Sequence, residues 1–308
     1  MSASSPAVPA RPAGQRGAAA PPATPSRRRP RMPNTVRLSL AIIVTALGLA
    51  VLGEAVAPYP FTEVALTSRL WPPAFVPGGS VSHLLGTDAL GRDVLSRLIV
   101  GLRASLGAGF GGVLVACMLG TTIGLCAGYF RGVTENILMM LADVKLALPG
   151  ILLAIGVIAV FGSTPLVLVL VIGLGIWVGF ARVVRSMVIR LRNEEFVLCA
   201  RSIGAGDLRI IVRHLLPNCV TPIIVLATLD VPTAIILEAS LSFLGIGIQA
   251  PIPSLGNMIS DGRVYLATNP WLTMVPAMML IILTLCVSRV GDWLSLILDP
   301  SSAGGTVR

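Results

Sequence analysis

Long apolar stretches are the feature that most constrains how this chain can fold. A helix that crosses the hydrocarbon core of a bilayer needs about 20 predominantly apolar residues. Because no water is available there, every backbone N–H and C=O must be bonded within the protein, which a helix achieves alone. The sequence therefore predicts an all-α integral membrane protein with six transmembrane helices, at about 36–57, 104–130, 137–161, 165–187, 221–244 and 271–291.

The composition agrees with a surface that largely faces lipid. Hydrophobic residues make up 55% of the 308 positions and charged residues only 12%, whereas a soluble domain carries roughly 25% charged residues. The net charge of +9 does not indicate nucleic-acid binding, because the basic residues gather between the apolar runs. The two histidines, His83 and His214, are too few and too far apart in sequence for a metal site, so no metal is predicted.

The N-terminal segment differs from the rest of the chain. Residues 1–34 are mostly Ala, Pro, Ser and Arg, and such a segment cannot bury enough apolar surface to offset its ordering entropy, so disorder is predicted. The first apolar run ends in Ala55-Val56-Ala57, which is similar to a signal-peptidase site. Its nearly full spanning length favours a retained membrane anchor over 35–57.

Arginines predict the orientation, since cytoplasmic loops are enriched in basic residues. With the N-terminus inside, the cytoplasmic side receives the arginines of the N-terminal segment and Arg131, Arg182, Arg185, Arg190, Arg192, Arg201, Arg209, Arg213, Arg289 and Arg308. The extracytoplasmic ends receive only Arg69, Arg92, Arg97, Arg103 and Arg263. An N-in, C-in topology is therefore predicted. Its parts are a disordered cytoplasmic tail (1–34), an anchor helix (35–57), an extracytoplasmic loop (58–103), a transmembrane domain (104–293) with a cytoplasmic loop at 188–220, and a cytoplasmic tail (294–308).

The second apolar run carries a stripe of small residues. Small side chains recur at every fourth position: Ala104, Ala108, Gly112, Ala116, Gly120, Gly124 and Gly128. Within lipid, small residues let two helix backbones approach closely, and packing then replaces the hydrophobic driving force. The stripe predicts a tight helix–helix contact.

Motifs for nucleotide binding and hydrolysis are missing from this sequence. A P-loop needs a lysine followed by Ser or Thr, but the single lysine, Lys145, is followed by Leu146. Neither G-x-S-x-G nor H-E-x-x-H occurs, and the few carboxylates are scattered. We therefore predict that the chain is not an enzyme and binds no cofactor.

The segment 195–218, between the fourth and fifth runs, has the pattern of two short helices. Gly204 is placed to take the left-handed conformation that ends a first helix, and Asp207 is suited to cap a second. Pro217 is predicted to end it. The second helix has apolar residues at i, i+3, i+4 and i+7, namely Leu208, Ile211, Val212 and Leu215.

Arg209 and Arg213 lie on the other side of that predicted helix, free to meet an acidic partner. An amphipathic helix at the membrane interface, with its arginines toward lipid headgroups, has the same pattern. Periodicity alone leaves both interpretations open.

The residues of this segment resemble the "EAA" loop of ABC-importer permeases. That loop has a Glu-Ala-Ala start, a glycine four residues after the second alanine and a Leu-Pro end. Here Cys199 and Ala200 take the two alanine positions, Gly204 the glycine and Leu216-Pro217 the end. Two residues depart from the pattern: Leu198 stands for the glutamate, so no role can be given to that carboxylate, and His214 stands for the usual isoleucine.

Two further stretches resemble the C-type subunit of the dipeptide, oligopeptide and nickel branch of these permeases. The first runs from Leu85 to Arg97 as LGTDALGRDVLSR, and the second is LSFLGIG at 241–247. The second continues to Pro251, Pro253, Gly256 and Gly262-Arg263. The resemblance covers about residues 80–300, with the motifs in the expected order.

This resemblance implies a type I ABC-importer permease fold in a bacterial cytoplasmic membrane. It implies four kinds of partner: a second, homologous permease subunit in a heterodimer, two ATP-binding subunits that use ATP and Mg, an extracytoplasmic substrate-binding protein, and the lipid bilayer. The residues expected to couple the chain to an ATPase are Cys199, Ala200, Arg201, Gly204, Asp207, Arg209, Arg213, Leu216 and Pro217.

The predicted function is that of a permease subunit forming half of an import pathway for di- or oligopeptides. Nickel chelates and glutathione-like peptides are alternatives within the same branch. A secondary transporter is disfavoured because no repeat relates the two halves, and an intramembrane enzyme or a structural scaffold is the rival from another class.

Asp230 and Glu238 fall inside the fifth run, where carboxylates are costly and point to function. They are candidate pathway residues that would meet a peptide's amino group. Hydrogen bonding between helices is the competing interpretation, and it is favoured for both residues, especially for Glu238, which lies beside the LSFLG motif. Asp143 and Lys145, spaced i, i+2, do not face each other on a helix and are assigned to packing.

Overall fold

A computed structural model of the chain describes residues 32–298. Over these residues the chain is helical, without a β-strand. The predicted disordered tail over 1–34 lies outside the described residues except for its last three. The helices are α1 (Asn34–Val56), α2 (Val94–Phe130), α3 (Gly132–Ala147), α4 (Gly150–Phe161), α5 (Pro165–Leu191), α6 (Glu195–Ser202), α7 (Asp207–Ile210), α8 (Leu216–Phe243), α9 (Leu255–Gly262) and α10 (Trp271–Leu298). Short 3₁₀ turns cover Leu66–Ser68 and Arg263–Tyr265, and a π-helical turn covers Ile211–Leu215.

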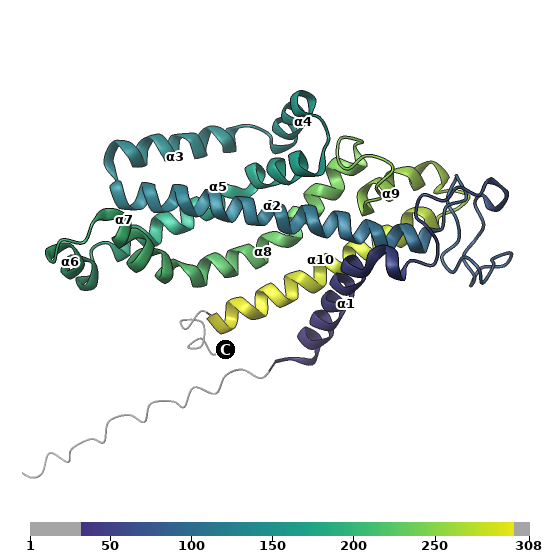
Figure 1. The fold of residues 1–308 in the computed structure, drawn as a ribbon, viewed down its shortest axis with the longest axis horizontal. Coiled ribbons are helices and arrows are strands. Elements are labelled where there is room, and N and C mark those ends of the chain that lie inside the picture. The colour runs from purple at the N-terminus through teal and green to yellow at the C-terminus, as the bar shows by residue number, and fades with distance from the viewer. Residues whose placement is uncertain (1–31, 299–308) are drawn as a thin grey trace, which may run out of the picture. The chain divides into compact units, whose positions relative to one another are not determined.

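Five long helices in the described part of the chain are apolar enough to cross a membrane: α1, α2, α5, the continuous segment from α7 through α8, and α10. The bent pair α3 and α4 brings the number to six if the two helices together form one span. Helix α2 packs along α5 and also contacts α8 and α1, while α10 packs against α8, α9 and α1 (Figure 1). The predicted all-α membrane fold is confirmed.

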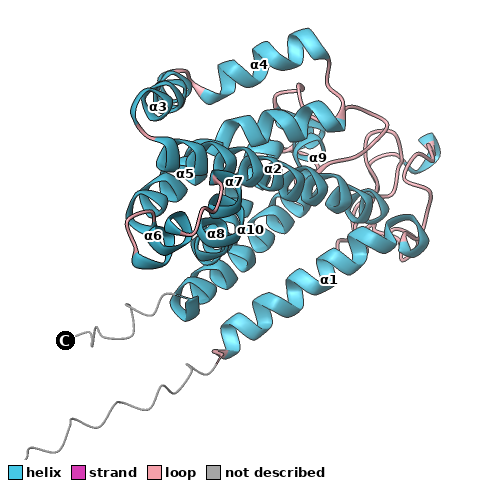
Figure 2. Ribbon diagram, turned by 60° about the vertical axis from the view of Figure 1, so that its left-hand side comes forward, coloured by secondary structure: helices cyan, strands magenta, loops and turns pink. Residues whose placement is uncertain are grey.

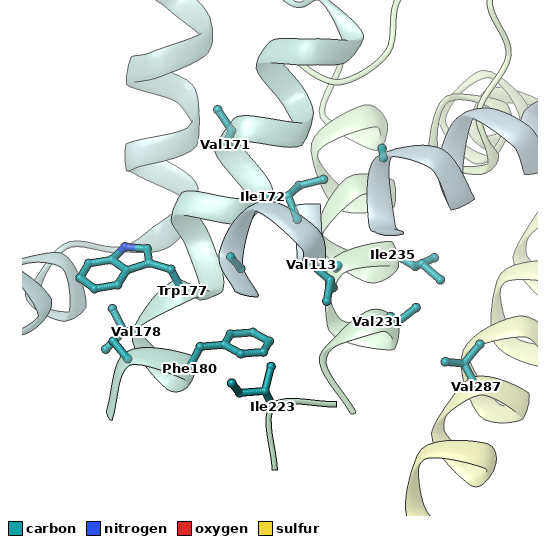
Figure 3. Packing of buried hydrophobic residues seen from close by; sticks show 14 of the residues in the cluster. Val113, Val171, Ile172, Trp177, Val178, Phe180, Ile223, Val231, Ile235 and Val287 are labelled. Atoms are coloured by element: carbon teal, nitrogen blue, oxygen red, sulfur yellow. The ribbon is translucent and has the colours of Figure 1, made fainter. Parts of the chain in front are cut away.

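The small-residue stripe lies at the contact between α2 and α5. A Cβ atom on Gly120 would lie 2.3 Å from the carbonyl oxygen of Trp177, and one on Gly124 would lie 2.6 Å from that of Ala181. These distances leave no room for a side chain, so the predicted close approach is confirmed. Next to this contact the apolar side chains of three helices meet, and Phe180 of α5 points toward Ile223 of α8 (Figure 3).

Helix α2 begins ten residues earlier than its apolar run predicts. Asp93 caps it, because its carboxylate accepts a hydrogen bond from the backbone N–H of Ser96 at 2.7 Å. The 37 residues of α2 give a length of about 55 Å, well beyond a hydrocarbon core of about 30 Å. The first turns of α2 therefore belong to the region predicted as an extracytoplasmic loop.

The third span is not the single helix that was predicted over 137–161. It breaks at Leu148 and Pro149, and α3 and α4 meet at 94° (Figure 2). The cause is local: a residue before proline is pushed out of the α region, and Leu148 is extended at φ −87° and ψ 130°. At the other end of the chain α10 runs to Leu298, so the first residues of the tail predicted from 294 are helical, and residues 299–308 lie outside the described range.

The orientation gives a direct prediction. Reporter fusions after Arg131 and after Arg192 should report a cytoplasmic position, since both follow spans that end among arginines. Fusions within 62–95 and 250–268 should report an extracytoplasmic position. Alkaline phosphatase activity marks an extracytoplasmic fusion, and green fluorescence marks a cytoplasmic one. A cytoplasmic result for 62–95 would contradict either the retained anchor or the orientation.

Candidate functional site

The first part of the site is the end of α6, where Gly204 adopts the predicted left-handed conformation. Its φ is +82°. Its N–H donates to the carbonyl of Arg201, and the N–H of Ala205 donates to that of Ala200, each at 3.0 Å. This pair of bonds is a Schellman motif. A Cβ on Gly204 would meet nothing within 4 Å, so only backbone strain opposes a larger residue at this position.

Asp207 does not cap the next helix as predicted. The N-cap is Gly206, and Asp207 is the first residue of α7. Its carboxylate instead accepts a hydrogen bond from the hydroxyl of Tyr129 at 2.5 Å, because the end of α2 lies beside it. Arg201 donates to the same hydroxyl at 3.1 Å and lies 5.7 Å from the ring centroid. Tyr129 thus ties both arms of the loop to α2.

Pro217 does not end the second helix. The chain continues from α7 through the π turn into α8 as one helical segment. The N–H of Leu216 bonds to the carbonyl of Ile211, five residues back, so the hydrogen-bond register changes just before the proline. Pro217, which has no N–H to donate, directly follows this wider turn, and the helix continues past it.

The apolar face of the second helix also differs from the predicted one. Ile211 and Leu215 are buried, together with Ile210, but Leu208 is 75% exposed and Val212 is 53% exposed. A π turn adds a residue to the helical turn, and this alters which side chains share a face. The loop therefore presents apolar side chains outward, and Ile203 at 86% exposure adds to them.

A shallow cavity lies between α6 and the second arm of the loop, with a volume of about 600 Å³. It brings together five of the nine predicted coupling residues: Cys199, Ala200, Gly204, Arg209 and Arg213. Within the described residues neither arginine has a carboxylate within 4.0 Å. The arrangement is an exposed mixture of apolar and cationic groups on a loop fixed to α2.

The two candidate pathway carboxylates have different surroundings. Asp230 is half-buried on α8 and has no hydrogen-bond partner among the described residues. Glu238 is fully buried, and its Oε1 accepts from the hydroxyl of Ser242 at 2.7 Å. The hydroxyls of Ser105 and Ser254 lie close to the same carboxyl group, although Oε2 meets no donor of good geometry in the described part of the chain. The burial of Glu238 and its serine neighbours favour hydrogen bonding within the protein over a pathway role for this carboxylate.

Asp143 and Lys145 connect α3 to α5, as their assignment to packing predicts. Asp143 accepts from Arg182 at 2.7 Å, and the ammonium of Lys145 donates to the carbonyl of Gly175. The two side chains do not pair with each other.

The first motif of the branch, LGTDALGRDVLSR, forms an ion-pair cluster at the extracytoplasmic end of α2. Asp88 accepts from Arg92 Nε at 2.7 Å and from Arg97 Nη1 at 2.5 Å, and Arg97 also lies 3.4 Å from Asp261 of α9. Burial acts to raise the pKa of Asp88, but Arg97, Arg92 and two backbone N–H groups outweigh it, so its pKa lies below the usual value. Sequence reasoning found the motif through resemblance and gave it no structural role.

The ion pairs of Asp88 predict a pH-dependent stability. Because the folded pKa is lowered, ionised Asp88 stabilises the fold at neutral pH, and this contribution is lost as the pH falls below about 4 toward the folded pKa. Asp88→Asn should therefore cost about 3 kcal/mol at pH 7. In thermal unfolding of the purified complex, the difference in unfolding midpoint between wild type and variant should narrow toward pH 3. A difference that is independent of pH would contradict this account.

Comparison with known proteins identifies the family. The model of the family described as "Binding-protein-dependent transport system inner membrane component" matches residues 120–303. The dipeptide transport system permease protein DppC of Haemophilus influenzae is 39% identical over 259 residues, which are 84% of this chain and 88% of that protein. The glutathione transport system permease protein GsiD of Pectobacterium atrosepticum is 42% identical over 223 residues, 72% of this chain and 74% of that protein.

Among solved structures, a chain of the MetNI methionine ABC transporter in inward-facing conformations matches with a TM-score of 0.52 at 18% identity. The match covers 66% of this chain and 96% of that chain, and it supports the type I importer fold. The resemblance to ABC-importer permeases is thereby confirmed. Since the family model spans more than half of the sequence and relatives above 30% identity span most of it, the chain belongs to the family of binding-protein-dependent transport system inner membrane components.

Proposed function

We propose that this permease forms half of the pathway of an ATP-driven importer for di- or oligopeptides, with the segment 199–217 as its contact to an ATPase. The observation that carries the proposal is the exposed loop, which presents Ile203, Leu208 and Val212. Beside them lie two arginines without a carboxylate within 4.0 Å among the described residues. Apolar groups flanked by cations suit a partner groove with an acidic rim. The family is the inner membrane component of binding-protein-dependent transport systems, and in the proposed complex ATP and Mg would be used by the partner subunits.

The loop is connected to the membrane in a way that transmits movement. Its second arm continues without a break into α8, so that Asp207–Phe243 is a single helical segment of 37 residues. Its first arm is bound to the second through Tyr129 at the cytoplasmic end of α2. A displacement of the loop by an ATPase therefore moves α8 and α2 together. The extracytoplasmic binding protein and the second permease would complete the complex.

Peptide is the proposed substrate class because the relatives in the comparison are permeases named for dipeptide, di/tripeptide and glutathione transport. The test is uptake by a strain that lacks this permease and is complemented with it. Labelled dipeptides, longer oligopeptides, glutathione and nickel should be compared. Uptake of dipeptide or oligopeptide supports the proposal. Uptake of glutathione alone, which the 42% identity to a GsiD protein makes the second candidate, would replace it, and uptake of nickel alone would refute it.

Asp230 is the proposed pathway carboxylate of α8. A carboxylate in a membrane span that has no partner among residues 32–298 is available to a cation, and a peptide carries one at its amino terminus. Asp230→Asn should raise the KM for peptide uptake by roughly tenfold, which corresponds to one lost ionic contact. The measurement needs a complex that contains all subunits in normal proportion. Unchanged uptake kinetics in such a complex would exclude the pathway role.

A further inference from the structure

A cavity at the end of the spans that is predicted to be extracytoplasmic contains none of the residues assigned to coupling or to the pathway. We call it the outer cavity. It has a volume of about 450 Å³ and lies between the end of α1, the first part of α2, the start of α5 and the loop after α8. Phe61, Val169, Ile248 and Ile252 contribute apolar walls. Glu54 and Arg103 are its two charged lining residues, and all the others are apolar.

These two charges have no ion-pair partner in the part of the chain that the structure describes. Glu54 and Arg103 both line the outer cavity, yet within the described residues neither has an oppositely charged group within 4.0 Å. Both residues are exposed, and opposite charges that line one apolar cavity without pairing with each other are available to a ligand that itself carries both signs. The walls contain no other side chain able to donate or accept a strong hydrogen bond.

The depth of the outer cavity matches the headgroup layer of the outer leaflet. From Arg131, at the predicted cytoplasmic end of α2, back to Arg103 the helix extends about 42 Å at 1.5 Å per residue. A bilayer including its headgroups is about 40–45 Å thick. Arg103 therefore lies at the level of the outer phosphates, with the apolar walls reaching toward the acyl chains.

We propose that the outer cavity binds a phospholipid whose headgroup carries both a phosphate and a primary ammonium, such as phosphatidylethanolamine. The guanidinium of Arg103 binds the phosphate, for which its planar donors are suited. The carboxylate of Glu54 accepts hydrogen bonds from the ammonium, and an acyl chain lies against the walls.

A zwitterionic peptide has the same two charges but fits the walls poorly. Its backbone amides would lose water without gaining hydrogen bonds, which costs free energy for every group left unpaired. Phosphatidylglycerol offers no cation to Glu54. Phosphatidylcholine offers a cation without N–H donors.

The test uses the assembled transporter in nanodiscs of phosphatidylethanolamine and phosphatidylglycerol, with tightly bound lipids counted by native mass spectrometry. Arg103→Gln should reduce bound phosphatidylethanolamine about tenfold, since a charged hydrogen-bonded contact is lost. Glu54→Gln should remove the preference for phosphatidylethanolamine over phosphatidylcholine in a matched nanodisc.

Gly107→Leu fills the outer cavity without touching its charges. Gly107 lines the cavity, and a Cβ there meets nothing within 4 Å, so the helix should fold normally while the lipid is excluded. Gly156→Leu on α4 is the matched control, because its Cβ also meets nothing and it lies outside the cavity. Lipid counts in Gly107→Leu equal to those of the control would overturn the proposal. Displacement of lipid by a labelled dipeptide at micromolar concentration would assign the outer cavity to peptide and overturn it as well.

Discussion

Gly120→Leu is expected to destroy the packing of α2 on α5 and to leave little assembled transporter in the membrane. The Cβ of the new side chain would lie 2.3 Å from the carbonyl oxygen of Trp177 and 2.6 Å from the Cβ of Phe180. Both are positions fixed by the backbone of α5, so the strain cannot be relieved by a rotamer change. Overpacking of cores typically costs 1–3 kcal/mol, and here two helices must separate, so a cost of about 3 kcal/mol or more is expected.

The measurement is the thermal unfolding midpoint and the yield of detergent-purified protein, with Gly179→Leu as the control. Gly179 lies on α5, one residue before Phe180, but a Cβ there meets nothing within 4 Å. The control changes a glycine to leucine in the same helix pair without affecting the contact. Equal yields and midpoints for the two variants would mean that α2 and α5 are not in close contact.

The fold follows from the sequence where a single physical requirement acts along the chain. Spanning lipid requires long apolar runs, and close helix contact within lipid requires small residues. Both requirements leave patterns that can be recognised without a structure, and both predictions are confirmed. The start of α2 at Val94 was missed for another reason: Leu95, Leu98, Ile99 and Leu102 fall at i, i+3, i+4 and i+7, but the prediction placed the start of the helix by its uninterrupted apolar run alone. The cap on Asp93 and the ion pairs of Arg97 stabilise that first part of the helix.

The break between α3 and α4 was available to sequence reasoning and was missed. Pro149 carries the information, since proline disfavours helix for the residue before it. Average hydropathy does not distinguish a continuous span from two short helices at an angle. Pro222, Pro232 and Pro276 lie within α8 and α10 without ending them, so proline alone is not sufficient evidence for a break in this chain.

In the loop 199–217, too, some features could be predicted from the sequence and others could not. The conformation of Gly204 depends on a few neighbouring residues and could be predicted. The hydrogen bond from Tyr129 to Asp207 joins residues 78 positions apart, and no local pattern indicates it. The π turn has no sequence pattern of its own either, and it decides that Leu208 and Val212 face outward. The composition of the loop was therefore predictable, and the surface it presents was not.

The loop gives the second large prediction: Gly204→Val should disrupt the coupling between the permease and the ATPase, so that both transport and substrate-stimulated ATP hydrolysis fall. A β-branched residue at φ +82° is strained, and the chain would leave the left-handed conformation to relieve about 2 kcal/mol. The two hydrogen bonds of the Schellman motif would then be lost and α6 would change direction relative to α7. Peptide uptake and substrate-stimulated ATPase activity should fall about tenfold or more, while insertion of the spans is retained.

Gly206→Val is the matched control, two residues further along. Gly206 has φ −69° and ψ 155°, which a β-branched residue adopts readily, and a Cβ there also meets nothing within 4 Å. The two variants add the same side chain to the same exposed loop and differ in backbone strain.

Reversing the charge of Arg209 or Arg213 to glutamate tests the docking surface separately. The loss of ATPase co-purification should grow as salt is lowered, because exposed charges are then less screened.

Gly204→Val and Gly206→Val together distinguish a contact that transmits force from a helix that only lies on the membrane. If the loop is an interfacial helix, both valines fall on a surface that faces headgroups, and both variants should keep the ATPases and transport normally. If the loop is the contact to the ATPase, only Gly204→Val changes the angle at which α6 meets its partner, and activity should separate the two. Wild-type transport by Gly204→Val, with the ATPases retained, would therefore contradict the coupling role assigned to residues 199–217.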